Sequence, residues 1–177
     1  PWSPPLPDQL TERLELLANG EQSILLKSLQ RGIEKESLRV SSDGKLAQTP
    51  HPRGLGSALT HPYVTTDFSE SLLELITPVS TSIDETLETL DTVHRDVYQH
   101  LAGEEMWGAS MPCAVAGNDS IPIAQYGSSN VATMKTVYRN GLGNRYGRVM
   151  QTIAGIHYNF SLPQQLWVLL QQQDHNK

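Results

Sequence analysis

Two carboxylates stand in a predicted β-strand where core residues belong. Residues 32–40 have the composition of a strand, and on a strand residues two apart point to the same face. Glu34 and Glu36 therefore begin a row that continues with Leu38 and Val40. Ionised side by side, the two groups repel each other, and burial adds a desolvation cost to each. They must be paired with Arg or Lys, share a proton, face water or bind a cation.

A second predicted strand, residues 71–77, repeats the anomaly. Glu74 shares a face with Glu70, Leu72 and Ile76, and Asp67 lies just upstream at the approach to the strand. A single Glu in a strand is usually an edge residue or one half of a salt bridge. Two strands with the same defect favour a shared cause, because several carboxylates then need cations at once.

A third segment, residues 149–160, is predicted as a strand that supplies a neutral ligand. His157 falls on its more polar face, where Gly155 leaves room, while Tyr158 and Phe160 fall on the face predicted as core. A lone strand histidine is more often a hydrogen-bonded structural residue than a ligand. If the three strands share one sheet with their polar faces together, the ligand interpretation becomes the better one.

Carboxylates with one imidazole suit a hard divalent ion. Mg²⁺ and Mn²⁺ take oxygen ligands, and a histidine is better tolerated by Mn²⁺. The single Cys113 excludes an internal disulfide framework and a zinc site built on several thiolates. Carboxylates that hold such ions commonly do so to bind nucleotide phosphates and neutralise charge in phosphoryl transfer.

Cations cluster elsewhere in the chain. Within fourteen residues lie Lys135, Arg139, Arg145 and Arg148, interleaved with Tyr138 and Tyr146. Arginine suits bidentate recognition of a carboxylate or phosphate, although a solvated helix face explains the same pattern. The nearby Gly141-Leu142-Gly143-Asn144 lacks the Lys-Ser/Thr ending of a phosphate-binding Walker A loop.

Helices are predicted on both sides of these strands. Residues 8–18 and 24–29 are periodic, and a further helix is expected near residues 130–140. The strongest signal is a capping box at Ser82 and Glu85, followed by an apolar stripe from Ile83 to Leu101. An apolar helix should start near Pro163.

Composition narrows the class of protein. The chain has 177 residues, with 13 Lys and Arg against 19 Asp and Glu, a net charge of −6. An acidic surface argues against a general binder of nucleic acid or anionic membranes. No apolar run approaches the ~20 residues of a membrane span, and residues 1–7 lack the parts of a signal peptide. We expect a cytoplasmic protein.

Beyond these patterns, the sequence resembles the bacterial glutamate–cysteine ligases of the proteobacterial type. The resemblance runs in order over roughly residues 31–166 and rests on the following segments: Arg31-Gly32-Ile33-Glu34-Lys35-Glu36-Ser37-Leu38-Arg39-Val40, Thr65-Thr66-Asp67-Phe68-Ser69-Glu70, Leu73-Glu74-Leu75-Ile76-Thr77-Pro78, Ala124-Gln125-Tyr126-Gly127-Ser128-Ser129-Asn130, Lys135-Thr136-Val137-Tyr138-Arg139 and Asn144-Arg145-Tyr146-Gly147.

The resemblance implies an α+β fold with a glutamine-synthetase-like antiparallel sheet and flanking helices. It also implies that ATP phosphorylates the γ-carboxylate of L-glutamate and that L-cysteine attacks the γ-glutamyl phosphate, the first step of glutathione biosynthesis. Residues 1–30 would form an N-terminal helical segment, and residues 31–177 the N-terminal part of an incomplete catalytic domain.

Site residues carried over by motif fall into three groups. Those expected to bind Mg²⁺ (or Mn²⁺) are Glu34, Glu36, Asp67, Glu74 and His157; those expected to line the cysteine pocket are Phe68, Tyr138, Leu142 and Gln151; and Arg139 is expected to face a substrate carboxylate or phosphate. The resemblance assigns no residue to ATP itself. Because family members are about three times longer, the chain should be inactive alone and need the remainder of the polypeptide.

Two other readings stay open. The chain could be a non-catalytic module that binds a divalent metal or another ligand. It could also be a metal-free hydrolase with a Glu pair as acid and base, which requires carboxyl groups ~5–5.5 or ~6.5–9.5 Å apart. Loss of activity with EDTA would dispose of the hydrolase.

Overall fold

A computed structural model describes residues 7–175 of the chain. Most of the Pro-rich start, residues 1–6, lies outside the described residues, as do the last two residues. The helices are α1 (Pro7–Ala18), α2 (Gly20–Lys27), α3 (Ile83–Gln99), α4 (Asn130–Tyr146) and α5 (Gln164–His175); the strands are β1 (Gln30–Val40), β2 (Val64–Thr66), β3 (Leu72–Ile76), β4 (Glu105–Met106) and β5 (Ile156–Ser161). None of the helices in this part of the chain has the length and apolar character needed to cross a membrane.

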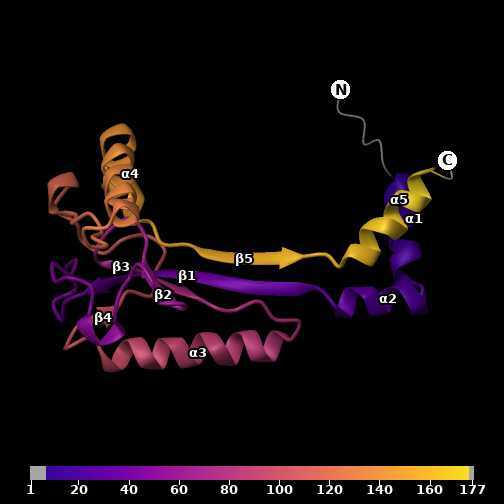
Figure 1. The fold of residues 1–177 in the computed structure, drawn as a ribbon, viewed down its shortest axis with the longest axis horizontal. Coiled ribbons are helices and arrows are strands. Elements are labelled where there is room, and N and C mark those ends of the chain that lie inside the picture. Colours follow the sequence, from indigo (N-terminus) through magenta and orange to yellow (C-terminus); the bar gives the residue numbers. More distant parts are fainter. Residues whose placement is uncertain (1–6, 176–177) are drawn as a thin grey trace.

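The strands form one antiparallel sheet around β1. Strand β3 pairs with β1 over residues 34–38 of β1, β5 pairs with residues 30–35, and β4 pairs with residues 39–40. The short β2, which the sequence did not reveal, extends the sheet beyond β3. Figure 1 shows β1 and β5 running together from the body of the molecule to a separate group of helices. The α+β class with an antiparallel sheet and flanking helices is as predicted.

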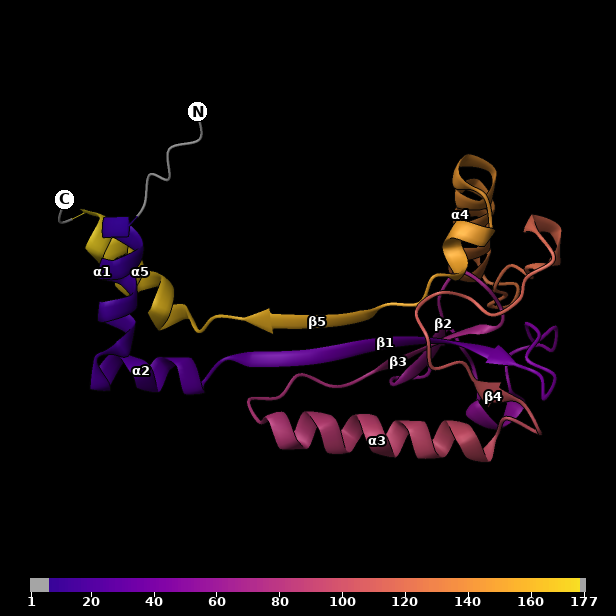
Figure 2. The ribbon, with the colours of Figure 1, turned by 180° about the vertical axis from the view of Figure 1, so that it is seen from behind.

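The sheet is covered on two sides. On one side Leu38 of β1 and Leu72 of β3 pack with Phe68 in a first buried cluster. On the other, Leu73 and Leu75 pack against α3 through residues such as Val97. Alternate residues of β3 therefore point into two different buried clusters, one on each face of the sheet. Figures 1 and 2 show α3 and α4 on opposite sides of the sheet.

The apolar stripe of helix α3 is buried only in its C-terminal half. Val93 and Val97 are buried, whereas Ile83 and Leu87 at the start of the predicted stripe are more than half exposed. The side chain of Ser82 accepts a hydrogen bond from the backbone N–H of Glu85, as a cap should. The second bond of the predicted capping box, from the backbone N–H of Ser82 to the Glu85 carboxylate, is wrong.

That reciprocal contact is replaced by one to an earlier serine. The Glu85 carboxylate accepts a hydrogen bond from Ser80 Oγ, and the Ser80 oxygen accepts one from the backbone N–H of Ser82 at 2.9 Å. Ser80 thus takes the N–H that the carboxylate was expected to satisfy, and it links the start of α3 to the preceding loop.

The predicted strand over residues 149–160 is shorter than expected. Its first part is a 3₁₀ turn, Val149–Thr152, and β5 begins only at Ile156. The expected core face is confirmed at Thr152 and Ala154, which are buried before β5 begins, and is wrong within β5, where Tyr158 and Phe160 are 57% and 66% exposed. Strand β5 pairs with β1 alone, so it lies at the edge of the sheet.

Helices α1, α2 and α5 gather at the far end of the long β1–β5 pair (Figures 1 and 2). Arg13 of α1 and Asp174 of α5 form an ion pair of 3.1 Å between exposed side chains. Exposed pairs contribute little stability, about 0–1 kcal/mol. The predicted division of the chain near residue 30 remains a prediction.

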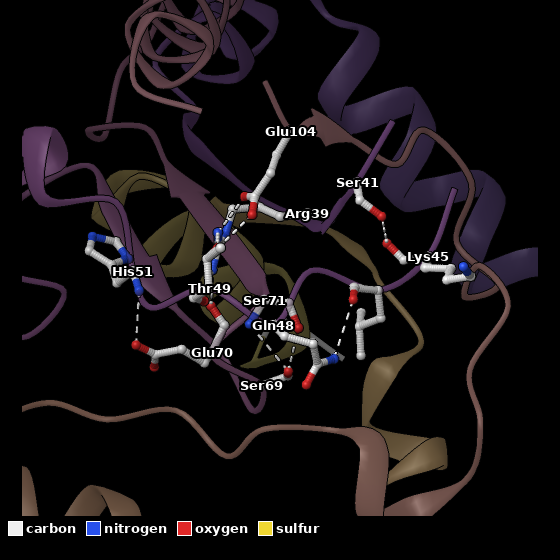
Figure 3. Close-up of polar contacts among 11 residues, drawn as sticks. Arg39, Ser41, Lys45, Gln48, Thr49, His51, Ser69, Glu70, Ser71 and Glu104 are labelled. Atoms are coloured by element: carbon white, nitrogen blue, oxygen red, sulfur yellow. Dashed lines mark hydrogen bonds and ion pairs between the residues drawn. The ribbon is translucent and has the colours of Figure 1, made fainter. Parts of the chain in front are cut away.

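A buried arginine ties β1 to the surrounding loops (Figure 3). Arg39 is 1% exposed, and its guanidinium donates to the carboxylate of Glu104 and to the carbonyl oxygens of Thr49 and Glu70. A buried charge is tolerated only when it is paired in this way. The Glu70 carboxylate also joins two loops, because it accepts a hydrogen bond from the backbone N–H of His51.

Candidate functional site

The register of the sheet brings the acidic residues of different strands together. Glu36 of β1 lies directly opposite Glu74 of β3, and Glu34 lies directly opposite His157 of β5. Directly paired residues of an antiparallel sheet have Cβ atoms about 4.5–5.5 Å apart on the same face. The three strands thus place three carboxylates and one imidazole on one face.

The imidazole lies between two of these carboxylates without a hydrogen bond to either. His157 Nε2 is 3.7 Å from a Glu36 oxygen, and Nδ1 is 4.0 Å from a Glu34 oxygen. Both separations exceed hydrogen-bond distance. The other Glu36 oxygen accepts a hydrogen bond of 2.7 Å from the backbone N–H of Gly155. A Cβ atom at Gly155 would lie 3.0 Å from His157 Nε2, so the glycine gives the ring its place.

The carboxylates are held close enough to disturb one another's protonation. Burial, followed by the charges of Asp67, Glu34 and Glu36, raises the pKa of Glu74 to about 7. Burial also raises the pKa of Glu36, and the charges of Asp67 and Glu34 add to that rise. Asp67, which comes directly after β2, therefore belongs to the same electrostatic group.

No Lys or Arg among residues 7–175 neutralises this group. In that part of the chain, none of the four carboxylates forms an ion pair with a Lys or Arg side chain. The arrangement is an anionic face with one imidazole, which we call the acidic face: Glu34, Glu36, Asp67, Glu74 and His157. Such a group is stabilised by protons or by a bound cation.

The donor atoms of the acidic face, carboxylate oxygens and one imidazole, fit a divalent ion in their chemistry. The two nitrogens of His157 lie 3.7 and 4.0 Å from the Glu36 and Glu34 oxygens, one nitrogen toward each carboxylate. In the described part of the chain, no three His, Cys, Asp or Glu side chains already converge on one point. A third ligand would have to arrive by rotation of a side chain.

Arg139 of α4 contacts the backbone next to the acidic face. Its Nε donates to the carbonyl oxygen of Asp67, and one terminal nitrogen donates to the carbonyl oxygen of Lys135. The guanidinium also lies 4.7 Å from the ring centroid of Tyr126. The predicted contact of Arg139 with a substrate anion remains a prediction.

The residues expected to line the cysteine pocket are not equally exposed. Phe68 is 2% exposed in the first core cluster, and Leu142 packs on that cluster. Gln151 is half-buried in the 3₁₀ turn before β5, while Tyr138 is 63% exposed on α4. The structure thus joins Phe68 and Leu142 in one cluster, and the shared pocket stays a prediction.

Two residues near the site received no role from the sequence. Tyr126 is buried and hydrogen-bonds to the backbone at Asp67. Glu70 accepts hydrogen bonds from the backbone N–H groups of His51 and Gln125, so it fixes the loop that carries Tyr126. Both lie in segments that carry the family resemblance. Alternation also places Glu70 on the same strand face as Glu74, whereas no spacing or pattern singles out Tyr126.

Comparisons with known proteins agree on one family. The family model for glutamate–cysteine ligase matches residues 14–177. The glutamate–cysteine ligase of Alcanivorax borkumensis is 60% identical over 163 residues, which are 92% of this chain and 31% of that protein. The Pseudomonas aeruginosa ligase is 57% identical over 165 residues, 93% of this chain and 31% of that protein. The chain thus spans about a third of the length of these relatives.

Solved structures give the same result. A glutamate–cysteine ligase from Francisella tularensis, crystallised in complex with AMP, matches 84% of this chain with a TM-score of 0.80 and 44% identity, over 30% of its own length. A bifunctional glutathione synthetase from Pasteurella multocida matches 90% with a TM-score of 0.79 and 35% identity, over 20% of its length. On this sequence and fold, the chain belongs to the glutamate–cysteine ligase family.

Proposed function

We propose that this chain supplies part of the active site of an ATP-dependent ligase. The enzyme joins the γ-carboxylate of L-glutamate to the amine of L-cysteine through γ-glutamyl phosphate, which is the first step of glutathione biosynthesis. The observation that carries the proposal is the acidic face, in which carboxylates from β1, β3 and the end of β2 meet His157 of β5 without a Lys or Arg partner among the described residues.

The acidic face would hold Mg²⁺, or Mn²⁺, through Glu34, Glu36, Asp67, Glu74 and His157. Bound there, the ions would neutralise phosphate oxygens and the acceptor carboxylate, which otherwise repel each other. The relative crystallised with AMP supports an adenine nucleotide as co-substrate. The raised pKa values of Glu74 and Glu36 support the metal assignment, because they report half-buried carboxylates crowded against one another.

The other residues of the site would bind and orient the substrates. Arg139 would add a fixed positive charge near the transferred phosphoryl group. Phe68 and Leu142 would form the apolar wall of a cysteine pocket completed by Tyr138 and Gln151. Enclosing the substrates in this way would also protect the acyl phosphate from water.

The location and organisation of the protein follow from this activity. Its substrates are small cytoplasmic metabolites, so we place the enzyme in the cytoplasm, with no nucleic-acid or membrane partner. We assign residues 31–177 to the catalytic domain and residues 1–30 to a helical segment beside it. Because the chain spans 31% of its relatives' length, we expect the active site to need residues from the remainder of the ligase polypeptide.

A chimera tests this function directly. The matching segment of the Alcanivorax borkumensis ligase is replaced by this sequence, and γ-glutamylcysteine formed from ATP, glutamate and cysteine is measured by mass spectrometry. The chimera should be active, and Glu36→Gln should lower its turnover at least about 100-fold, the scale of losing one preorganised electrostatic contact. Glu88→Gln, at an exposed carboxylate of α3, is the matched control and should leave turnover unchanged.

Two results would refute the proposal. One is a folded chimera that forms no γ-glutamylcysteine although the parent ligase does. The other is full activity in the Glu36→Gln chimera, because the acidic face would then have no part in the reaction. The 177-residue chain alone should form no product.

A further inference from the structure

Tyr126 is a buried residue whose hydroxyl and aromatic ring both contact other groups. It lies in the chain between a 3₁₀ turn, Asn118–Ser120, and α4, and it is 7% exposed. Its ring packs in a small cluster with Ala58, Ala124 and Ala132. A phenylalanine ring would pack equally well among these alanines. The hydroxyl of Tyr126 therefore has a separate role.

The hydroxyl is directed at the backbone that carries Asp67. The Tyr126 hydroxyl donates to the carbonyl oxygen of Thr66 at 2.6 Å, in the peptide unit that leads into Asp67, and its oxygen also lies 3.0 Å from the carbonyl oxygen of Asp67. The backbone N–H of Asp67 in turn donates to the carbonyl oxygen of Leu72 at 3.0 Å. The main chain of Asp67 is therefore fixed from both sides, just past the end of β2.

Two cationic side chains of α4 lie over the ring of Tyr126. The guanidinium of Arg139 lies 4.7 Å from the ring centroid, and the Lys135 ammonium lies 5.0 Å from it. Arg139 also donates to the carbonyl oxygen of Asp67 that the Tyr126 hydroxyl approaches. One tyrosine thus connects α4 to the segment that presents the Asp67 carboxylate.

We propose that Tyr126 is a positioning residue that fixes the Asp67 carboxylate against Glu36 and Glu74 of the acidic face. The hydroxyl holds the Asp67 backbone, and the ring holds Arg139 against the same carbonyl oxygen. This role rests on the proposed function, because it assumes that the acidic face binds divalent ions. Residues that orient metal ligands commonly contribute about 10–100-fold to metal affinity.

The test measures Mn²⁺ affinity without any assay of activity. Free Mn²⁺ is followed by electron paramagnetic resonance during titration of the chimeric ligase and its variants, without substrates. Tyr126→Phe removes the hydroxyl and keeps the ring, and it should weaken Mn²⁺ binding at least about 10-fold. Tyr158→Phe, which removes the hydroxyl of an exposed tyrosine on β5, is the matched control and should bind as the unmodified chimera does.

A double-mutant cycle with Asp67→Asn separates positioning from general loss of structure. Asp67→Asn removes the ligand itself, so Tyr126→Phe added to it should cause no further loss of affinity if the tyrosine acts through Asp67. A merely structural role would give additive losses. Circular dichroism of each variant identifies the temperature at which all are folded, and the titrations are made there.

The outcomes distinguish the two proposals. If Asp67→Asn weakens Mn²⁺ binding and Tyr126→Phe does not, or if the two losses add, the positioning role is overturned and the metal site stands. If the unmodified chimera binds Mn²⁺ no better than its Glu36→Gln and Glu74→Gln variants, the metal site fails and the positioning role fails with it. Full coupling between Tyr126 and Asp67 supports both.

Discussion

Replacing Glu74 by glutamine should change how stability depends on pH. The pKa of Glu74 is raised from 4.5 to about 7, mainly by burial and then by the charges of Asp67, Glu34 and Glu36. A raised carboxyl pKa means that the folded state holds the proton more tightly than the unfolded state. The stabilisation is therefore complete below about pH 4.5 and is lost as the pH rises through about 7.

The size of the effect follows from the shift. At about 1.4 kcal/mol per pKa unit, the full shift corresponds to an upper limit of roughly 3.5 kcal/mol. Water reaches part of this face, so screening reduces the expected effect to about 1–2 kcal/mol. For a chain of this length that is a change of about 2–8 °C in melting temperature.

The assay compares unmodified chain and Glu74→Gln by urea unfolding in EDTA at about pH 5 and pH 8, on either side of most of the titration. Because glutamine does not ionise, the variant should gain about 1–2 kcal/mol relative to the unmodified chain between the two values. Taking the difference between the two proteins at each pH removes contributions from other titrating groups. Adding Mg²⁺ at the higher pH should stabilise the unmodified chain more than the variant.

Two observations would refute the reasoning. The first is a stability difference between the two proteins that is the same at both pH values. The second is a variant less stable than the unmodified chain at the higher pH in EDTA, which would mean that ionised Glu74 is stabilised by a partner. Glu88→Gln, on the exposed surface of α3, serves as the control and should show no relative change with pH.

Three further predictions concern stability and can be checked by the same unfolding measurements. Leu73→Ala, at a fully buried position, should lower the free energy of unfolding by about 2–5 kcal/mol. Ile156→Ala, on the exposed face of β5, should change it by no more than about 0.5 kcal/mol. Equal losses would contradict the assignment of the core. Arg39→Gln should cost about 3–5 kcal/mol because Glu104 loses its buried partner, and a near-neutral result would show that this pair is dispensable. Ser82→Ala should cost about 1 kcal/mol through loss of the α3 cap, and an unchanged midpoint would argue against that cap.

The sequence predicted the site best where charged residues interrupt an otherwise apolar strand face. Alternation on β1 and β3 placed Glu34, Glu36 and Glu74 in rows with core residues, and the structure brings these three together with His157. Side-chain period is a local property of a strand, so faces could be predicted before pairing was known. Their identity as metal ligands remains a prediction.

Predictions of burial and of hydrogen-bond partners failed where they depended on which other segment packs nearby. Tyr158 and Phe160 have the pattern of a buried face, yet exposure depends on what covers β5, which its own residues do not encode. In the same way, Glu85 has the spacing of a capping box, but Ser80 competes for the same N–H. Burial and hydrogen-bond choice are set by tertiary contacts, which a single sequence does not display.

Tyr126 illustrates a third kind of failure. A tyrosine in a loop has no periodicity, and its contact with Asp67 spans 59 residues of sequence. Only the fold reveals that its hydroxyl meets the backbone of a site residue. Residues that act through another residue's main chain are therefore the least visible to sequence reasoning.

The central claim is that the acidic face binds divalent ions that meet a nucleotide. Anomalous diffraction from crystals of the chimeric ligase, grown with Mn²⁺ and a non-hydrolysable ATP analogue, tests it most directly. We expect manganese peaks bounded by Glu36, Glu74 and His157, in contact with the phosphate oxygens. An ordered nucleotide with no manganese at these side chains would contradict it.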